Sequence, residues 1–234
     1  MKKMHLLICL VLTLFLTACA EWDLIGRGAV EAFDRIINTE QRHVASSTSN
    51  HSWRWFIAMP DGSASFGWGR ETQSYFDSFE LSLTFDGQPF IEAGLDGDKL
   101  EEGIHLFNRD DWGGILLTAN LGTAGSTEVS DINSPIPIRA FEQLIHANPE
   151  ILAYHDTGHH YMLHLGDSGH MIMFARDVTT QEAGFVFMLN PQPFIDAGTD
   201  VHNIAGWSYE ERETMTMRGS TLAQYFLVKT FDLK

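Results

Sequence analysis

The sequence predicts an α+β protein made by tandem duplication of one unit, a helix followed by an antiparallel β-meander. The first observation is a repeated stretch: residues 88–94 read Gln-Pro-Phe-Ile-Glu-Ala-Gly, and residues 192–198 read Gln-Pro-Phe-Ile-Asp-Ala-Gly. The second is that each copy of this stretch follows a helix-like spacing and several runs in which apolar and other residues alternate. Helices on antiparallel sheets are an α+β arrangement.

The two halves correspond well beyond the repeated stretch. Phe33 matches Phe141 at an offset of 108, Arg70 matches Arg176 at 106, and the repeated stretch itself has an offset of 104. A slow drift of this kind indicates duplication of a unit of roughly 105 residues. The predicted organisation is a signal peptide over 1–18, a first copy over 19–125 and a second copy over 126–234, with a linker at about 122–134.

The chain begins with an export signal. Lys2 and Lys3 precede an apolar run over residues 6–16, which is too short for a permanent membrane span. Residues 16–19, Leu-Thr-Ala-Cys, resemble the bacterial lipobox. This resemblance implies cleavage before Cys19 and attachment of palmitate-type acyl chains there. The protein would then lie in the cell envelope, on the periplasmic face of the outer membrane in a Gram-negative source or the outer face of the plasma membrane in a Gram-positive one. The alternative is an ordinary signal peptide.

Charge and cysteine content narrow the function. The chain's 2 cysteines are Cys9, in the leader, and Cys19, so residues 20–234 contain no thiol. Removal of residues 1–18 leaves 13 basic residues against 31 acidic ones, a net charge of −18. This balance excludes nucleic acid as the expected partner and excludes electrostatic binding to anionic lipid, so any membrane contact would be made by the lipid anchor alone.

In the first half, Val30, Phe33, Ile36 and Ile37 lie on one helical face and predict a helix over 29–39. The polar residues 42–50 predict a connector. Alternation predicts strands over 53–59 and 79–85, with a hairpin turn at Asp61 and Gly62 between the first of these and the strand that carries Phe66. A last strand over 115–121 precedes the linker.

The second half repeats this order. The predicted elements are a helix over 138–146, a strand to about 165, a turn over 166–169, strands over 170–175 and 184–189, and a hairpin joining 214–217 to 223–231. The repeated stretch has two interpretations, because Pro89 and Pro193 fit either the start of a strand or the first turn of a short helix that ends at Gly94 or Gly198.

Residues 166–169, Gly-Asp-Ser-Gly, resemble the sequence around the nucleophile of chymotrypsin-like serine proteases. Such a resemblance would imply a catalytic Ser168. The family's next glycine is His170 here, and its Ala-Ala-His-Cys histidine context is missing. Because the segment aligns with the turn at Asp61 and Gly62, the interpretation is a turn that uses Asp and Gly for their backbone preferences.

The strongest candidate site lies on either side of that turn, where histidines and methionines alternate with apolar residues. A hairpin with residues 167 and 168 at its tip pairs His164 with Met171 and Met162 with Met173. One face of the hairpin then carries five potential ligands, namely His160, Met162, His164, Met171 and Met173. The other face aligns with Trp55 and Ile57 of the first copy, so it is predicted to be the helix-covered face.

Imidazole together with thioether is a ligand set that soft Cu(I) prefers, so copper is the cofactor that this face predicts. Zn²⁺ or haem bound through the histidines alone is a further alternative. The competing interpretation is that methionine fills gaps and histidine tolerates partial burial, so that the face packs on the sheet of the other copy.

The sequence therefore predicts a lipid-anchored, non-enzymatic binding protein of the cell envelope, which binds an apolar small ligand, a protein partner or a soft metal. One alternative is an immunity or inhibitor lipoprotein that masks a basic toxin or envelope enzyme with its acidic surface. Another is an envelope hydrolase, which requires acids or bases that converge in a pocket.

Overall fold

The computed structural model is of the whole chain, and the structure is described for thirteen stretches of it. These are residues 26–37, 44–48, 53–58, 64–71, 78–101, 104–109, 114–124, 137–147, 151–155, 160–165, 168–176, 183–216 and 220–233. Within them the protein is mixed α+β, with every strand pair antiparallel. No helix among the described residues is long and apolar enough to cross a membrane.

The first half forms one six-stranded sheet, with strand order β1-β2-β3-β4-β6-β5. Its strands are β1 (Val44–Thr48), β2 (Trp53–Ala58), β3 (Ala64–Glu71), β4 (Ser78–Asp86), β5 (Ile104–Arg109) and β6 (Gly114–Ala124). The alternation that predicts a strand over 79–85 is that of β4, whose Leu81, Leu83 and Phe85 are buried.

The second half forms another six-stranded sheet, with order β7-β8-β9-β10-β12-β11. Its strands are β7 (Leu152–His155), β8 (His160–His164), β9 (Met171–Arg176), β10 (Ala183–Leu189), β11 (Ser208–Met215) and β12 (Thr221–Leu233). In order of appearance along the chain, the six strands of each half therefore occupy the same places in their sheets.

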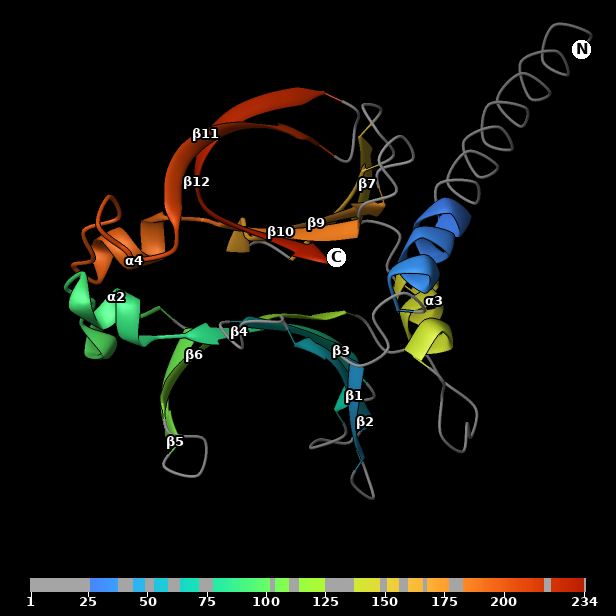
Figure 1. Ribbon diagram of the computed structural model, residues 1–234, viewed down its shortest axis with the longest axis horizontal. Coiled ribbons are helices and arrows are strands. Elements are labelled where there is room, and N and C mark those ends of the chain that lie inside the picture. The colour runs from blue at the N-terminus through green and yellow to red at the C-terminus, as the bar shows by residue number, and fades with distance from the viewer. Residues whose placement is uncertain are drawn as a thin grey trace, which may run out of the picture.

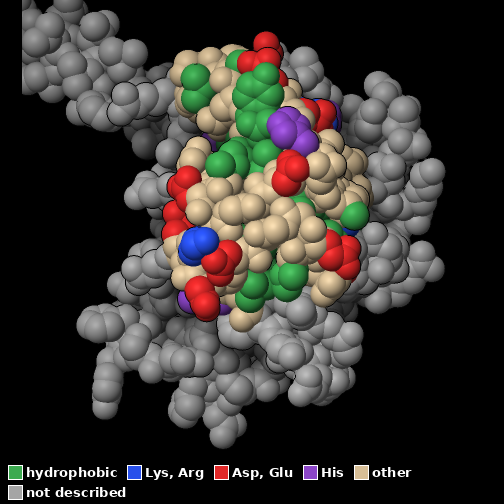
Figure 2. All heavy atoms as spheres, turned by 90° about the vertical axis from the view of Figure 1, so that its left-hand side faces the viewer, with side chains coloured by type: hydrophobic (Ala, Val, Ile, Leu, Met, Phe, Trp, Pro, Cys, Tyr) green, Lys and Arg blue, Asp and Glu red, His purple; other side chains and the backbone are tan. Residues whose placement is uncertain are grey.

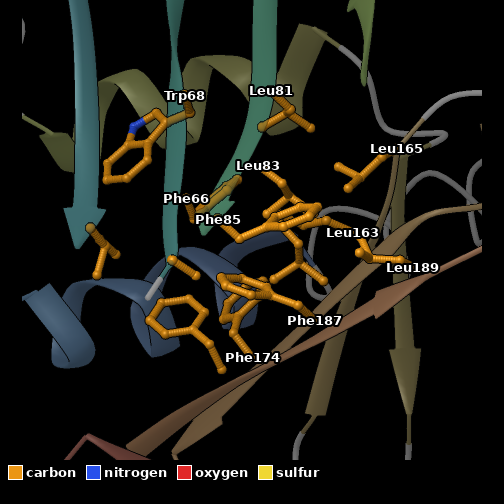
Figure 3. Close-up of a cluster of buried hydrophobic side chains, with 14 of the residues drawn as sticks. Phe66, Trp68, Leu81, Leu83, Phe85, Leu163, Leu165, Phe174, Phe187 and Leu189 are labelled. Carbon is orange, nitrogen blue, oxygen red and sulfur yellow. The ribbon is translucent and has the colours of Figure 1, made fainter. Parts of the chain in front are cut away.

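The two sheets face each other, and the main hydrophobic core fills the space between them (Figure 1). Apolar side chains from β3 and β4 point toward those from β8, β9 and β10, as the labelled Phe66, Leu83, Leu163 and Phe187 show in Figure 3. All four of these side chains are 0% exposed. Burial of this apolar area is the main source of the free energy that holds the two halves together.

One end of this core is closed by two helices that lie side by side, residues 26–37 and α3 (Pro137–Ala147) (Figure 1). The rings of Phe33 and Phe141 stack, with centroids 3.9 Å apart and an interplanar angle of 12°. Trp68 of β3 meets Phe33 edge-on at 4.9 Å, and its indole Nε1–H donates to the carbonyl of Pro137 at 3.3 Å. The indole thus joins the sheet of the first half to the helix of the second.

At the other end lie α2 (Gln88–Glu92) and α4 (Gln192–Asp196), so the repeated stretch forms a short helix with its proline in the first turn. The N–H of Asp96 donates to the carbonyl of Ala197 at 2.9 Å, and the N–H of Asp200 donates to the carbonyl of Ala93 at 2.7 Å. Phe90 and Phe194 are buried with ring centroids 5.2 Å apart. The two copies of the stretch therefore bind each other.

Each short helix ends at a glycine with positive φ, +98° at Gly94 and +91° at Gly198. A Cβ on Gly94 would lie 3.0 Å from the carbonyl oxygen of Gly198, and a Cβ on Gly198 would lie 3.4 Å from that of Gly94. Both the left-handed conformation and this close approach favour glycine. Glycine at 94 and at 198 thus allows the ends of the two short helices to approach each other closely.

One prediction for the first half is wrong. The polar residues 42–50 predict a connector, but Val44–Thr48 is the strand β1, which pairs with β2 at the edge of the sheet formed by the described residues. Ser and Thr in 42–50 suggest a loop, whereas an edge strand such as β1 needs only one paired side and tolerates polar residues. β6 ends at Ala124, close to the start of the linker that is predicted at about 122–134.

Candidate functional site

The five residues of the predicted site lie on β8 and β9, on the face of the second sheet that points away from the main core. The predicted register is confirmed, since Met162 pairs with Met173 and His164 with Met171. The alternate residues Tyr161, Leu163, Ile172 and Phe174 belong to the main core.

This face carries a second hydrophobic cluster that is rich in sulfur. Its buried members are Ala153, Met162, Met171, Met188, Phe226 and Val228, and Met173, Val186 and Met215 pack against them. Met162 is 1% exposed, and Met171 and Met188 are each 2% exposed. Met188 lies directly opposite Met171 in the β9–β10 pairing.

The cover over this cluster comes from the same sheet. β11 and β12 arch away from α4 and return above β9 and β10 toward β7, as Figure 1 shows. Phe226 and Val228 of β12 point into the arch and are 1% and 3% exposed. The alternative in which this face packs on the other copy's sheet is therefore wrong, because that sheet packs on the opposite face.

Methionine is unevenly distributed between the two clusters. The chain has nine methionines. Five of them belong to the second cluster, and none is among the described residues of the main core. If methionine served only to fill gaps, it would be expected in the larger core as well.

His164 lies at the rim of the cluster, half buried, and joins β8 to the end of β11. Its Nε2 is 3.2 Å from the carbonyl oxygen of Met215. A carbonyl can only accept, so Nε2 carries the proton and donates, and in the neutral ring Nδ1 keeps its lone pair. Burial lowers the pKa of His164 below 6.5, with a smaller opposing effect from the bond to Met215. The imidazole is therefore neutral at pH 7 and has one nitrogen suited to a metal.

His160, the remaining predicted ligand, is half buried and lies opposite His155 in the β7–β8 pairing. Met188 and Met215 are members of the cluster that the sequence reasoning missed. A signal for Met188 was present, because the alternation that buries Phe187 and Leu189 turns Met188 to the methionine face. Met215 had no such signal, since its place depends on the curvature of the whole sheet.

His170 lies apart from this cluster, at the end of the β8–β9 hairpin, and is 1% exposed. Its Nδ1 accepts the backbone N–H of Asn190 at 2.9 Å, so in the neutral ring Nε2 carries the proton. That Nε2 is buried without a hydrogen-bond partner among the described residues. Burial lowers the pKa of His170 to about 4.

Ser168 belongs to a turn, as predicted. Its hydroxyl donates to the carbonyl of Leu165 and accepts the backbone N–H of His170 at 3.2 Å. The N–H of Leu165 donates to the carbonyl of His170 at 3.0 Å and closes the hairpin. The hydroxyl is thus engaged by backbone, and no imidazole among the described residues accepts from it as a serine nucleophile requires.

Cys19, the predicted lipid attachment site, lies outside the described residues. Among the residues that are described, no three side chains of His, Cys, Asp or Glu are grouped so that they could hold a metal ion.

Comparisons with models of known protein families, with curated protein sequences and with solved structures find no match to this chain.

Proposed function

We propose that the chain is a lipid-anchored, non-enzymatic binding protein of the cell envelope, and that the methionine cluster of its second sheet binds Cu(I). The observation that carries the proposal is the gathering of five methionines beside His164, while the main core of the described residues has none. Thioethers and a neutral imidazole are ligands that soft Cu(I) prefers.

The geometry favours the second sheet over the first for this function. The rows of cross-strand neighbours His164–Met171–Met188 and Met162–Met173 are adjacent on one face. Directly opposed side chains have Cβ atoms about 4.5–5.5 Å apart, which flexible methionines can span toward a shared ion. In the first sheet, the residues that match Met162 and Met173 are Phe56 and Gly67, neither of which can bind a metal through its side chain.

The test is a Cu(I) titration of the full chain in competition with a chromophoric chelator, with Ag(I) as a second soft ion that does not oxidise. The variant Met162→Leu/Met171→Leu/Met188→Leu removes three sulfurs while it nearly conserves volume, a change that usually costs less than about 1.5 kcal/mol per site. Loss of an outer partner of a ligand already weakens metal binding about 10–100-fold, so loss of these sulfurs should weaken it at least as much.

Met59→Leu, which removes a sulfur from the first half, is the matched control. Unchanged affinity in the triple variant, with melting that shows a folded protein, would reject the copper proposal and leave an apolar ligand or a protein partner as the bound species. A protein that binds Cu(I) should also melt at a higher temperature when copper is present, since the ligand stabilises the folded state by mass action.

The pH dependence of binding should follow His164. Because burial holds its pKa below 6.5, Nδ1 stays available as the pH falls through 6.5, and Cu(I) affinity should decline only at lower pH. In His164→Gln this decline should be absent and the affinity lower throughout. The exposed His146 provides the control substitution, His146→Gln.

The proposed anchor is Cys19. Its support is the positive and apolar leader followed by the lipobox-like residues 16–19. Radiolabelled fatty acid should enter the wild-type protein and not Cys19→Ser, which should appear in the soluble fraction. Equal labelling of both proteins would show that the anchor lies elsewhere or does not exist.

We also propose that the two halves arose by duplication of one unit. Supporting this, the sheets share one strand order, and matched residues touch their own counterparts, as Phe33 touches Phe141 and Phe90 touches Phe194. The bonds from Asp96 to Ala197 and from Asp200 to Ala93 are reciprocal. Contacts between self-equivalent positions occur where two copies are related by a twofold axis.

A further inference from the structure

The outer face of the β11–β12 hairpin carries a group of aromatic rings that the methionine cluster does not involve. Tyr209 and Tyr225 stack with centroids 5.2 Å apart and an interplanar angle of 26°. His202 meets Tyr209 edge-on at 4.8 Å. Tyr225 is 51% exposed, the largest value among the exposed large hydrophobic residues that the structure describes.

The charged side chains of β11 are divided between the two faces of the strand. Glu211 lies directly opposite Tyr225, and Glu213 lies opposite Ala223, so both acids share the tyrosine face and both are exposed. Arg212 lies between them on the other face, where its guanidinium donates to Glu210 at 2.8 Å. The tyrosine face therefore presents carboxylates, while the basic residue of β11 is turned away and paired.

Figure 2 shows the side of the molecule where α2 and α4 lie, below the β11–β12 arch. Hydrophobic side chains gather in its upper part, with a histidine beside them and acidic side chains around them. We use the name tyrosine patch for His202, Tyr209, Glu211, Glu213 and Tyr225.

We propose that the tyrosine patch is a docking surface for a basic protein, whose lysine or arginine side chains stack on Tyr225 and pair with Glu211 and Glu213. A cation is attracted by the face of an aromatic ring and by carboxylates alike. A ring–cation contact of this kind already exists nearby, since Nζ of Lys229 on β12 lies 5.7 Å from the ring centroid of Trp207 and 5.4 Å from that of Phe231.

Charge complementarity favours a basic partner over an acidic one. The sequence after residue 18 has a net charge of −18 by its residue counts, which draws a basic protein toward the surface at long range and repels an acidic one. A sugar chain fits the patch less well, because Tyr209 is covered by Tyr225 on one side and by His202 on another. The rings therefore do not form a flat double platform.

The experiment measures binding of the full chain to an immobilised ten-residue peptide of alternating arginine and glycine and to lysozyme, a basic protein, at about 0.15 M salt, where the Debye length is about 8 Å. Truncation of aromatic anchors in interfaces commonly weakens binding roughly tenfold or more. Tyr225→Ala and Glu211→Gln/Glu213→Gln should each do so for both probes. The matched control is Glu31→Gln/Glu142→Gln, which removes the same charge from two exposed helix positions.

Equal weakening by the patch and control variants would show attraction to net charge alone and would overturn the proposal. Failure of both probes to bind the wild type would overturn it too, as would binding of chitohexaose that depends on Tyr225, or self-association that Tyr225→Ala abolishes. Tyr225→Phe keeps the ring and should retain affinity, which separates stacking from a hydroxyl hydrogen bond. Melting curves of each variant verify that the hairpin is folded.

Discussion

Acidification should destabilise this protein through one buried imidazole, that of His170. The side chain is 1% exposed, and burial lowers its pKa to about 4. In the unfolded chain a histidine has a pKa of about 6.5. The unfolded state therefore binds the proton first as the pH falls, so stability rises with pH between these two values and is lost on descent from about 6.5 to about 4.

The size of the effect follows from the difference between the two pKa values. A gap of about 2.5 units at about 1.36 kcal/mol per unit gives a loss of about 3 kcal/mol. Protonation of His170 would break a hydrogen bond of the folded state. Nδ1 accepts the N–H of Asn190 at 2.9 Å, and a protonated Nδ1 would place two donors against each other. Small proteins have a total stability of about 5–15 kcal/mol, so this one group removes a substantial share of it.

The assay compares urea denaturation of the wild type and His170→Asn at several values between pH 7 and pH 4. Asparagine can present an amide oxygen where Nδ1 lies and does not titrate, so the difference between the two curves isolates His170 from the other ionisable groups. The wild type should lose about 3 kcal/mol more than the variant over this interval. Curves that remain parallel, or an imidazole NMR titration of His170 with its midpoint near 6.5, would refute the reasoning.

Two other predictions concern the packing of the fold. Gly94→Ala should lower the unfolding free energy by about 2 kcal/mol or more, and Gly198→Ala by somewhat less. Both residues have positive φ, but the added Cβ would lie 3.0 Å from a carbonyl oxygen at Gly94 and 3.4 Å from one at Gly198. The opposite order of the two losses in urea denaturation would contradict this geometry. Trp68→Ala should lower the unfolding free energy by about 3–5 kcal/mol, since the indole is 1% exposed and hydrogen-bonded to Pro137. Trp55→Ala should lower it by less, because Trp55 is only half buried. Equal losses for the two variants in calorimetry would argue against this difference in burial.

Local patterns in the sequence were sufficient for the elements whose environment is simple. The spacing of Phe33, Ile36 and Ile37 predicts a helix over 29–39, and the structure has one over 26–37. Strict alternation in Phe185, Phe187 and Leu189 predicts a strand over 184–189, and β10 spans Ala183–Leu189. In both cases one face is buried against the core, so the period of the apolar residues follows directly from the geometry of the element.

Features that depend on distant parts of the chain were not predictable in this way. Residues 104–109 form β5, for which the sequence analysis predicted no strand. β5 lies at the edge of its sheet and is held there by its pairing with β6. For the methionine face, the sequence predicted which side chains share it, but not that β11 and β12 arch over them. That cover arises from sheet curvature accumulated over six strands, for which no short pattern exists.

The contact of Phe33 with Phe141, and of Phe90 with Phe194, has a consequence for how the halves could diverge. If the proposed ancestor was a single unit, these self-matching contacts would have joined two separate molecules, and every substitution would have appeared twice in the dimer. In one chain the partner is always present at a high effective concentration, so pairing no longer depends on protein concentration. Each sheet could then change by itself, so that methionines could accumulate on the outer face of the second without a matching change in the first.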